Sequence, residues 1–162
     1  MRVLGIDPGT ATTGWAVVFA EDRSHSSVLS CGCVKTEPIK SLDKRLLEIY
    51  DGIQTIIKKY KPDVMVIEEL FFAKNTKTAI AVGHARGVAM LAASKEKIPV
   101  YEYTPLQVKQ AVVGYGRAEK GQVQEMLKCL LKTQDIPTQD DTADAIAVAL
   151  THIHTKRYRT SL

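Results

Sequence analysis

Short apolar segments follow one another along the first part of the chain and are separated by turn-forming residues. Val3 to Ile6, Trp15 to Ala20 and Val28 to Val34 are such segments, with Gly, Pro, Ser or charged residues between them. This order is typical of three successive β-strands. The connection from Glu21 to Ser27 is short and polar, which predicts that the second and third strands form an antiparallel hairpin. The chain is therefore expected to fold around a sheet.

From Ser41 the spacing of apolar residues changes to that of a helix, and a fourth strand follows. Lys61-Pro62-Asp63 ends the helical pattern, and Val64 to Ile67 is an apolar run typical of a strand buried on both faces. A helix between two strands allows them to pair in parallel, so the first and fourth strands can lie side by side. The helical repeat consists of Leu42, Leu46, Ile49, Ile53, Ile56 and Tyr60.

The rest of the chain completes an α/β fold in one domain, residues 1–162. We expect a mixed five-stranded sheet, with three antiparallel strands and then two parallel ones, flanked by helices. The many small residues between Thr76 and Lys95 fit either close packing on the sheet or a self-association face. Residues 156–162 form either a basic tail that contacts DNA or a frayed end. The further expected elements are helices at Thr76–Lys95, Thr104–Gly114, Glu119–Leu131 and Asp140–His154, and a strand at Pro99–Tyr103.

Composition narrows the class of protein. Hydrophobic residues make up 45% of the 162 residues and charged residues 25%, as in an average globular domain. No segment reaches the roughly 20 apolar residues of a membrane helix, and the N-terminus does not resemble a signal peptide. Three cysteines are an odd number, so we expect buried thiols rather than a disulfide framework. These features predict a cytoplasmic protein without a membrane partner, and the net charge of +4 suits a polyanionic one.

Four acidic residues lie at positions that the predicted fold can bring together. Asp7 and Glu68 each follow an apolar strand, and the carboxyl ends of parallel strands meet at the edge where α/β sheets bind ligands. Asp141 and Asp144 are three residues apart on a predicted helix and share a face. Alone, Asp7 also fits a turn, and the pattern does not decide between Glu68 and Glu69. Clustered carboxylates favour Mg²⁺ or Mn²⁺, and two such ions can support phosphodiester hydrolysis.

Several short motifs, in this order and spacing, resemble the RuvC family of Holliday-junction resolvases in the RNase H-like superfamily. The resemblance covers nearly the whole chain, and its specificity comes from the set rather than from any one motif. The motifs are Gly5-Ile6-Asp7-Pro8-Gly9, Thr13-Gly14, Ile67-Glu68, Phe71, Ala73-Lys74-Asn75, Ala85-Arg86-Gly87-Val88-Ala89, Gln107-Val108-Lys109-Gln110, Val112-Val113-Gly114, Ala118-Glu119-Lys120, Asp141 and Ala143-Asp144-Ala145.

The resemblance implies a homodimer with an RNase H-like fold that binds four-way DNA junctions and nicks two opposed strands. The products would carry 5′-phosphate and 3′-hydroxyl ends, the branch-migration proteins RuvA and RuvB would be partners, and short T-containing sites would be preferred. The residues that correspond to the family's metal ligands are Asp7, Glu68, Asp141 and Asp144, and this correspondence selects Glu68 over Glu69. Those that correspond to its DNA-contacting or catalytic residues are Phe71, Lys109 and Lys120, and we add Lys74 and Arg117 as basic neighbours. Phe72 and Tyr115 receive no role.

Two other functions fit parts of the pattern. Residues 5–10 also resemble the first phosphate loop of actin-like and sugar-kinase ATPases, but those proteins need a second, similar half that is not present in this sequence. A non-catalytic junction-binding module with structural acids is the other alternative. It would bind junctions equally well with EDTA and with Mg²⁺, and it would cut none.

Overall fold

The strands form one mixed sheet in the order β3-β2-β1-β4-β5. β1 pairs antiparallel with β2, and β2 with β3, whereas β4 is parallel to both β1 and β5. The expected sheet is therefore confirmed, including the hairpin and the parallel pairing of the first and fourth strands. The computed structural model describes residues 1–22, 24–69, 76–133, 136 and 140–155. The strands are β1 (Arg2–Asp7), β2 (Thr12–Ala20), β3 (Ser26–Lys35), β4 (Val64–Glu68) and β5 (Val100–Tyr103).

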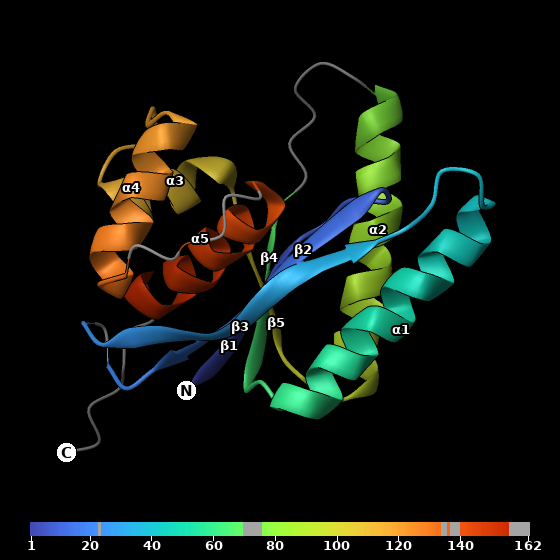
Figure 1. Cartoon of the computed structure of the whole chain (residues 1–162), viewed down its shortest axis with the longest axis horizontal. Coiled ribbons are helices and arrows are strands. Elements are labelled where there is room, and N and C mark those ends of the chain that lie inside the picture. The colour runs from blue at the N-terminus through green and yellow to red at the C-terminus, as the bar shows by residue number, and fades with distance from the viewer. Residues whose placement is uncertain (23, 70–75, 134–135, 137–139, 156–162) are drawn as a thin grey trace.

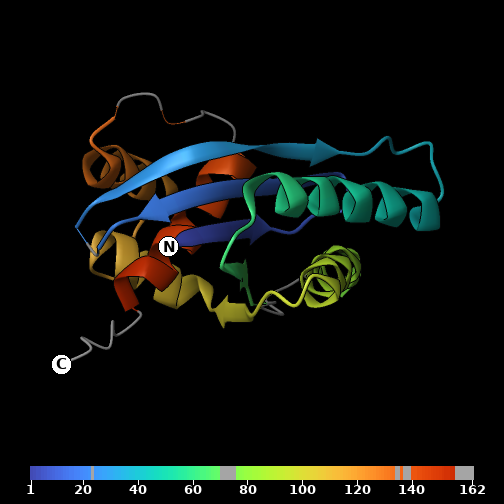
Figure 2. The same cartoon turned by 90° about the horizontal axis from the view of Figure 1, so that it is seen from below.

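Helices cover both faces of the sheet and give the molecule three layers (Figure 1). α1 and α2 lie on one face and α3, α4 and α5 on the other, as Figure 2 also shows from below. Each face encloses its own hydrophobic core, and the strands supply alternate residues to the two. The helices are α1 (Leu42–Tyr60), α2 (Thr76–Lys95), α3 (Pro105–Val113), α4 (Lys120–Leu131) and α5 (Asp140–Thr155).

Local sequence signals set the ends of α1 and α3. α1 ends at Lys61, which adopts a left-handed conformation with φ 47°, just before the proline that cannot continue the helix. α3 begins at Thr104, whose side chain and that of Gln107 each accept a hydrogen bond from the other's backbone N–H. Gly114, with φ 94°, ends α3 in the left-handed region that glycine tolerates.

α5 packs closely on β1 and β2 because glycines lie beneath it. A Cβ atom on Gly5 would be 2.1 Å from the backbone oxygen of Ala145, and a Cβ atom on Gly14 would be 2.1 Å from that of Asp141. Neither distance is possible for a side chain, so both positions require glycine. The helix can therefore lie directly on the strands, and its first turn reaches the end of β1.

The small residues of α2 divide by face. Ala85, Ala89, Ala92 and Ala93 are buried against the sheet. Ile80, His84, Gly87 and Leu91 recur at helical spacing on the other side and are exposed. Packing inside the molecule, against α1 as well as the sheet, therefore accounts for the alanines, and Ala85 does not belong to any self-association face.

Two further expectations concern membranes and thiols. Among the described residues, no helix is both long enough and apolar enough to span a bilayer. The expectation of buried thiols is wrong in detail, because Cys31 and Cys33 are half-buried on β3 and Cys129 is exposed on α4. Cys31 and Cys33 lie on a strand at the edge of the sheet, where packing covers them only in part.

Candidate active site

Asp7 and Glu68 lie at the same edge of the sheet, on neighbouring strands. β1 and β4 run parallel, and their register pairs Ile6 with Ile67, which places the two acids next to each other at the strand ends. Both are partly buried, whereas Glu69 is exposed. The two adjacent glutamates therefore differ in position: Glu68 is partly buried beside Asp7, and Glu69 is exposed to solvent.

The other two acids reach this edge from α5. Asp7 pairs across the sheet with Gly14, and the backbone of Asp141 lies directly over Gly14. Asp144 is one turn further along the same helix. Acids from β1, β4 and α5 therefore come together, although they are up to 137 residues apart in the sequence.

The electrostatic coupling of the acids shows how close they are. Burial, followed by the charges of Asp144, Glu68 and Asp141, raises the pKa of Asp7 from its ordinary value to about 7. Burial and the charge of Asp144 raise the pKa of Glu68 to about 7, against the opposing charge of Lys109. Burial also raises the pKa of Asp144. Carboxyl groups in this state favour a bound cation.

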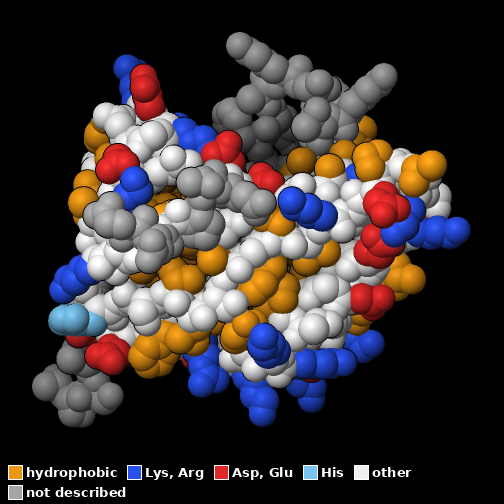
Figure 3. All heavy atoms as spheres, viewed as in Figure 1, with side chains coloured by type: hydrophobic (Ala, Val, Ile, Leu, Met, Phe, Trp, Pro, Cys, Tyr) orange, Lys and Arg blue, Asp and Glu red, His pale blue; other side chains and the backbone are white. Residues whose placement is uncertain are grey.

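Lys120 brings one positive charge to this group of acids. Its ammonium nitrogen is 3.2 Å from a carboxylate oxygen of Asp144 and 3.3 Å from one of Asp140. Asp144 interrupts an otherwise apolar stretch of α5, and this contact supplies its partner. In Figure 3 acidic and basic side chains lie side by side on the face formed by α3, α4 and the start of α5.

A hollow of about 240 Å³ opens beside these acids. Its walls come from β4, α3, α4 and α5, and the charged groups lie above an apolar floor. A phosphate placed at the charged side would meet lysines and carboxylates together. The lining residues are Glu68, Pro105, Val108, Lys109, Lys120, Val123, Asp144, Ala147 and Val148.

The donor set fits a hard divalent cation. All four candidate ligands are carboxylates, which prefer Mg²⁺ or Mn²⁺ to zinc, and burial and the neighbouring acids raise the pKa values of Asp7 and Glu68 more than the nearby lysines lower them. Within the described residues, no three acidic, imidazole or thiol side chains are already gathered tightly enough to hold one ion.

The remaining candidate residues are divided between the site and other places. Lys109 and Lys120 line the hollow. Arg117 is exposed in the turn between α3 and α4 and is not one of the lining residues. Phe71 and Lys74 lie outside the described residues, as do Phe72 and the segment 156–162. Tyr115 is 46% exposed.

Sequence reasoning gave no role to three residues that shape this edge. Asp140 shares Lys120 with Asp144, and Gly14 admits α5. Arg86 donates from Nε to the backbone oxygen of Glu68 over 3.3 Å and forms an ion pair with Glu102. The available signal for Arg86 was its position, since it is the single arginine of a helix in which eight of the twenty residues are Ala or Gly.

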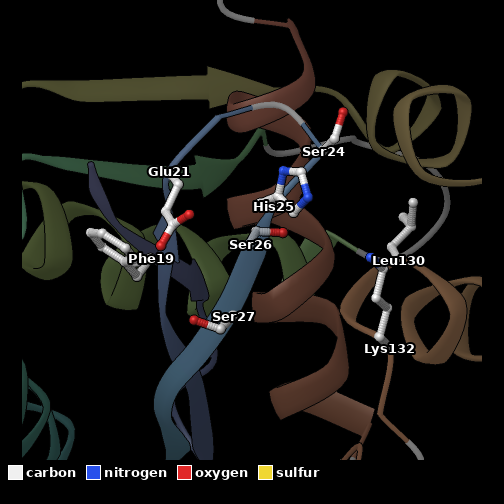
Figure 4. A pocket seen from close by; sticks show the side chains of 8 residues that line it. All are labelled: Phe19, Glu21, Ser24, His25, Ser26, Ser27, Leu130 and Lys132. Carbon is white, nitrogen blue, oxygen red and sulfur yellow. The ribbon is translucent and has the colours of Figure 1, made fainter.

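A second hollow lies at the opposite end of the sheet. Figure 4 shows Ser24 to Ser27 of the β2–β3 hairpin on one side and Leu130 and Lys132 across from them. Phe19, which also lines it, pairs with Arg2 at the start of β1, whereas Asp7 is at the end of that strand. This hollow is therefore remote from the carboxylates.

Comparisons with known proteins agree with this arrangement. A model of the family described as "Crossover junction endodeoxyribonuclease RuvC" matches residues 3–152. A protein of that name from Desulforamulus reducens is 58% identical over 94% of this chain and 93% of its own length. One from Caldanaerobacter subterraneus is 53% identical over 95% of this chain and 93% of its own length.

Solved structures give the same result. The structure titled "T. thermophilus RuvC in complex with Holliday junction substrate" superimposes with a TM-score of 0.90 at 36% identity, covering 95% of this chain and 93% of that one. The yeast mitochondrial Holliday junction resolvase Ydc2 shares the fold, with a TM-score of 0.64 at 15% identity, over 94% of this chain and 79% of that one. On this evidence of sequence and structure, the chain belongs to the RuvC family of crossover junction endodeoxyribonucleases.

Proposed function

We propose that the chain is a structure-specific endonuclease that resolves four-way (Holliday) DNA junctions by two symmetric, metal-dependent nicks, in recombination and DNA repair. The observation that carries this proposal is the convergence of carboxylates from β1, β4 and α5 at one sheet edge, in a chain that belongs to the RuvC family. The two cores share one sheet, which supports a single nuclease domain over residues 1–162.

Asp7, Glu68, Asp141 and Asp144 are the residues we assign to metal binding, with two Mg²⁺ ions per site and Mn²⁺ as a substitute. When bound, such ions supply an activated water and neutralise charge on the phosphate. Lys109 and Lys120 line the same hollow and would hold the phosphate oxygens there. Hydrolysis would leave 5′-phosphate and 3′-hydroxyl ends.

DNA binding extends this proposal beyond the hollow. The T. thermophilus RuvC structure, in complex with Holliday junction substrate, matches 95% of this chain, which supports the same substrate here. We assign Phe71 and Lys74 to contacts with the junction, in the segment that joins Glu68 to α2. Arg117 is exposed in the turn between α3 and α4, where it can reach a phosphate outside the hollow.

A homodimer would present two such sites to the two equivalent strands of a junction. The exposed face of α2 supports this assembly, because Ile80 and Leu91 are 55% and 61% exposed and lie on either side of Gly87. Partnership with RuvA and RuvB, and a cytoplasmic location with access to the chromosome, belong to the same proposal.

The decisive experiment is a nicking assay on a labelled immobile junction beside a linear duplex of the same sequence, with Mg²⁺, Mn²⁺ or EDTA. We expect paired nicks in the junction only, dependent on the metal. Asp7→Asn should bind the junction as tightly as the unmodified chain in EDTA and cut it at least a hundredfold more slowly. Cleavage at the normal rate by Asp7→Asn would refute the metal role, and metal-independent binding without any cleavage would indicate a junction-binding module instead.

A further inference from the structure

The backbone oxygen of Glu68 faces a position where the sheet supplies no donor. Along β4 the N–H groups of Met65 and Glu69 donate to the oxygens of Pro99 and Tyr103, over 2.9 and 2.8 Å, so the odd-numbered residues bond toward β5. Backbone groups alternate along a strand, and the even-numbered residues, including Glu68, therefore bond toward β1.

The register on the β1 side identifies the missing donor. Val66 pairs with Gly5 and Ile67 with Ile6, and the pairing ends there. In a parallel ladder of this register, the oxygen of Glu68 would accept from the N–H of residue 8. That residue is Pro8, which has no N–H, so the ladder cannot supply this hydrogen bond.

Arg86 supplies a donor from the helix above. Its Nε donates to the Glu68 oxygen over 3.3 Å, and its Nη2 forms an ion pair with Glu102 on β5. The Arg86 side chain is only 17% exposed. A guanidinium group can make both contacts because its donors form a rigid planar fork, whereas a lysine ammonium is a single point.

We propose that Arg86 is a positioning residue for Glu68: it takes the place of the ladder N–H that Pro8 lacks and so fixes the end of β4, with the Glu68 carboxylate directed at the other acids. This inference rests on the proposed metal-dependent function. Arg86 acts through the backbone, because its Nε donates to the backbone oxygen of Glu68 while its Nη2 is held by Glu102. Glu102 in turn holds the guanidinium group in place.

Four variants test this role by Mn²⁺ binding to the DNA-free protein, measured by titration calorimetry, together with junction affinity in EDTA. Arg86→Met and Arg86→Lys should each weaken Mn²⁺ binding about tenfold, the usual effect of removing a residue that orients a ligand. Glu102→Gln leaves the hydrogen bond from Arg86 Nε to the Glu68 oxygen in place, so it should weaken Mn²⁺ binding less than the two Arg86 variants do. Arg2→Met is the matched control, since Arg2 also donates to a backbone oxygen, that of Tyr60 over 3.2 Å, but at the start of β1, the opposite end of that strand from Asp7.

The sharpest test restores a backbone N–H at position 8 and measures whether Mn²⁺ affinity recovers. Pro8→Ala introduces an N–H opposite the Glu68 oxygen, so Pro8→Ala combined with Arg86→Met should regain several-fold of the lost Mn²⁺ affinity relative to Arg86→Met alone. A purely structural role of the arginine would show no such recovery. If Arg86→Met does not fold, the same comparison is made with Arg86→Lys.

The outcomes separate the two proposals. If the unmodified chain neither binds Mn²⁺ nor cuts junctions, the proposed function fails. If it does both, while Arg86→Lys binds Mn²⁺ as well as Arg2→Met does, or Pro8→Ala brings no recovery, the positioning role of Arg86 is overturned. Junction affinity in EDTA should remain within about twofold throughout, and a larger loss in Arg86→Lys would assign the residue to DNA binding instead.

Discussion

At the scale of single residues, the carboxylates determine what this edge of the sheet can do. Asp7 has its pKa raised to about 7 because it is buried and surrounded by three other acids. Lys120 forms ion pairs with Asp140 and Asp144 and opposes this effect only in part. The folded protein therefore carries an electrostatic cost at neutral pH that a divalent cation would remove.

Asp7→Asn should stabilise the metal-free protein, and the gain should depend on pH. A carboxyl group with a raised pKa in the folded state destabilises that state progressively as pH increases from about 4 to about 7. In EDTA at pH 8 the variant should unfold with a free energy roughly 1–3 kcal/mol higher, and near pH 4 the two proteins should be equal. Urea titrations across this pH range measure the difference in free energy of unfolding between the two proteins. A difference that does not change with pH would show that ionisation of Asp7 does not destabilise the folded state.

Lys109→Ala should reduce the number of phosphate contacts by one. Each contact contributes about 0.9 to the slope of log affinity against log salt on duplex DNA, so the slope should fall by about that amount. Lys97→Ala, in the turn that follows α2, is the control and should leave the slope unchanged. Junction binding measured by fluorescence anisotropy at several salt concentrations tests this, and an unaltered slope would remove Lys109 from the phosphate contacts.

At the scale of elements, the approach of α5 to the sheet places two acids beside a third. Gly14 lies under the backbone of Asp141, and Gly5 lies under that of Ala145. Because the helix contacts the strands directly, small changes at these glycines move the ends of α5 relative to β1. Site geometry therefore depends on residues that carry no chemistry of their own.

Gly14→Ala should displace the first turn of α5 and impair the site. The added methyl group would lie 2.1 Å from the oxygen of Asp141, so the helix must shift. We expect metal affinity and cleavage to fall at least tenfold and the free energy of unfolding to fall by about 1–3 kcal/mol. Gly121→Ala on α4, with nothing within 4 Å of the added atom, should instead be neutral or stabilise by about 0.5–1 kcal/mol. Equal behaviour of the two variants in calorimetry and cleavage would contradict this account.

At the scale of the whole molecule, α2 has one side packed in the core and one exposed apolar side on which a second copy of the chain could bind. One side of the helix carries the buried alanines, and the other exposes Ile80 and Leu91. Arg86, between these two sides, contacts the end of β4. Assembly through the exposed face would bring each partner close to the helix that supports Glu68.

Leu91→Glu should convert the proposed dimer to a monomer. A carboxylate at the centre of an apolar interface loses its hydration without gaining a partner, and we expect dimerisation to weaken at least tenfold. Leu47→Glu on α1, where the leucine is 58% exposed, is the control and should remain dimeric. Sedimentation velocity distinguishes the species, and an intact Leu91→Glu dimer would place the interface elsewhere. Ala85 is unsuitable for this test because its side chain is fully buried in the core.

Much of the architecture was predictable from local patterns. The apolar runs, the helical repeat after Ser41 and the cap at Thr104 each specify an element through neighbouring residues, and all of these elements are present. The parallel pairing of β1 and β4 followed from the helical connection between them. Asp7 and Glu68 could therefore be placed at one edge, although the pattern itself did not choose between Glu68 and Glu69.

Which segments become strands and helices could be predicted from the amino-acid sequence, because periodicity and turn chemistry act between residues that are close along the chain. The contacts that complete the site depend on the packed fold instead: Asp141 rests over Gly14, Lys120 bridges Asp140 and Asp144, and Arg86 donates to the backbone oxygen of Glu68. Those contacts join segments far apart in sequence, and their distances depend on how closely whole helices pack on the sheet. No local pattern encodes that approach.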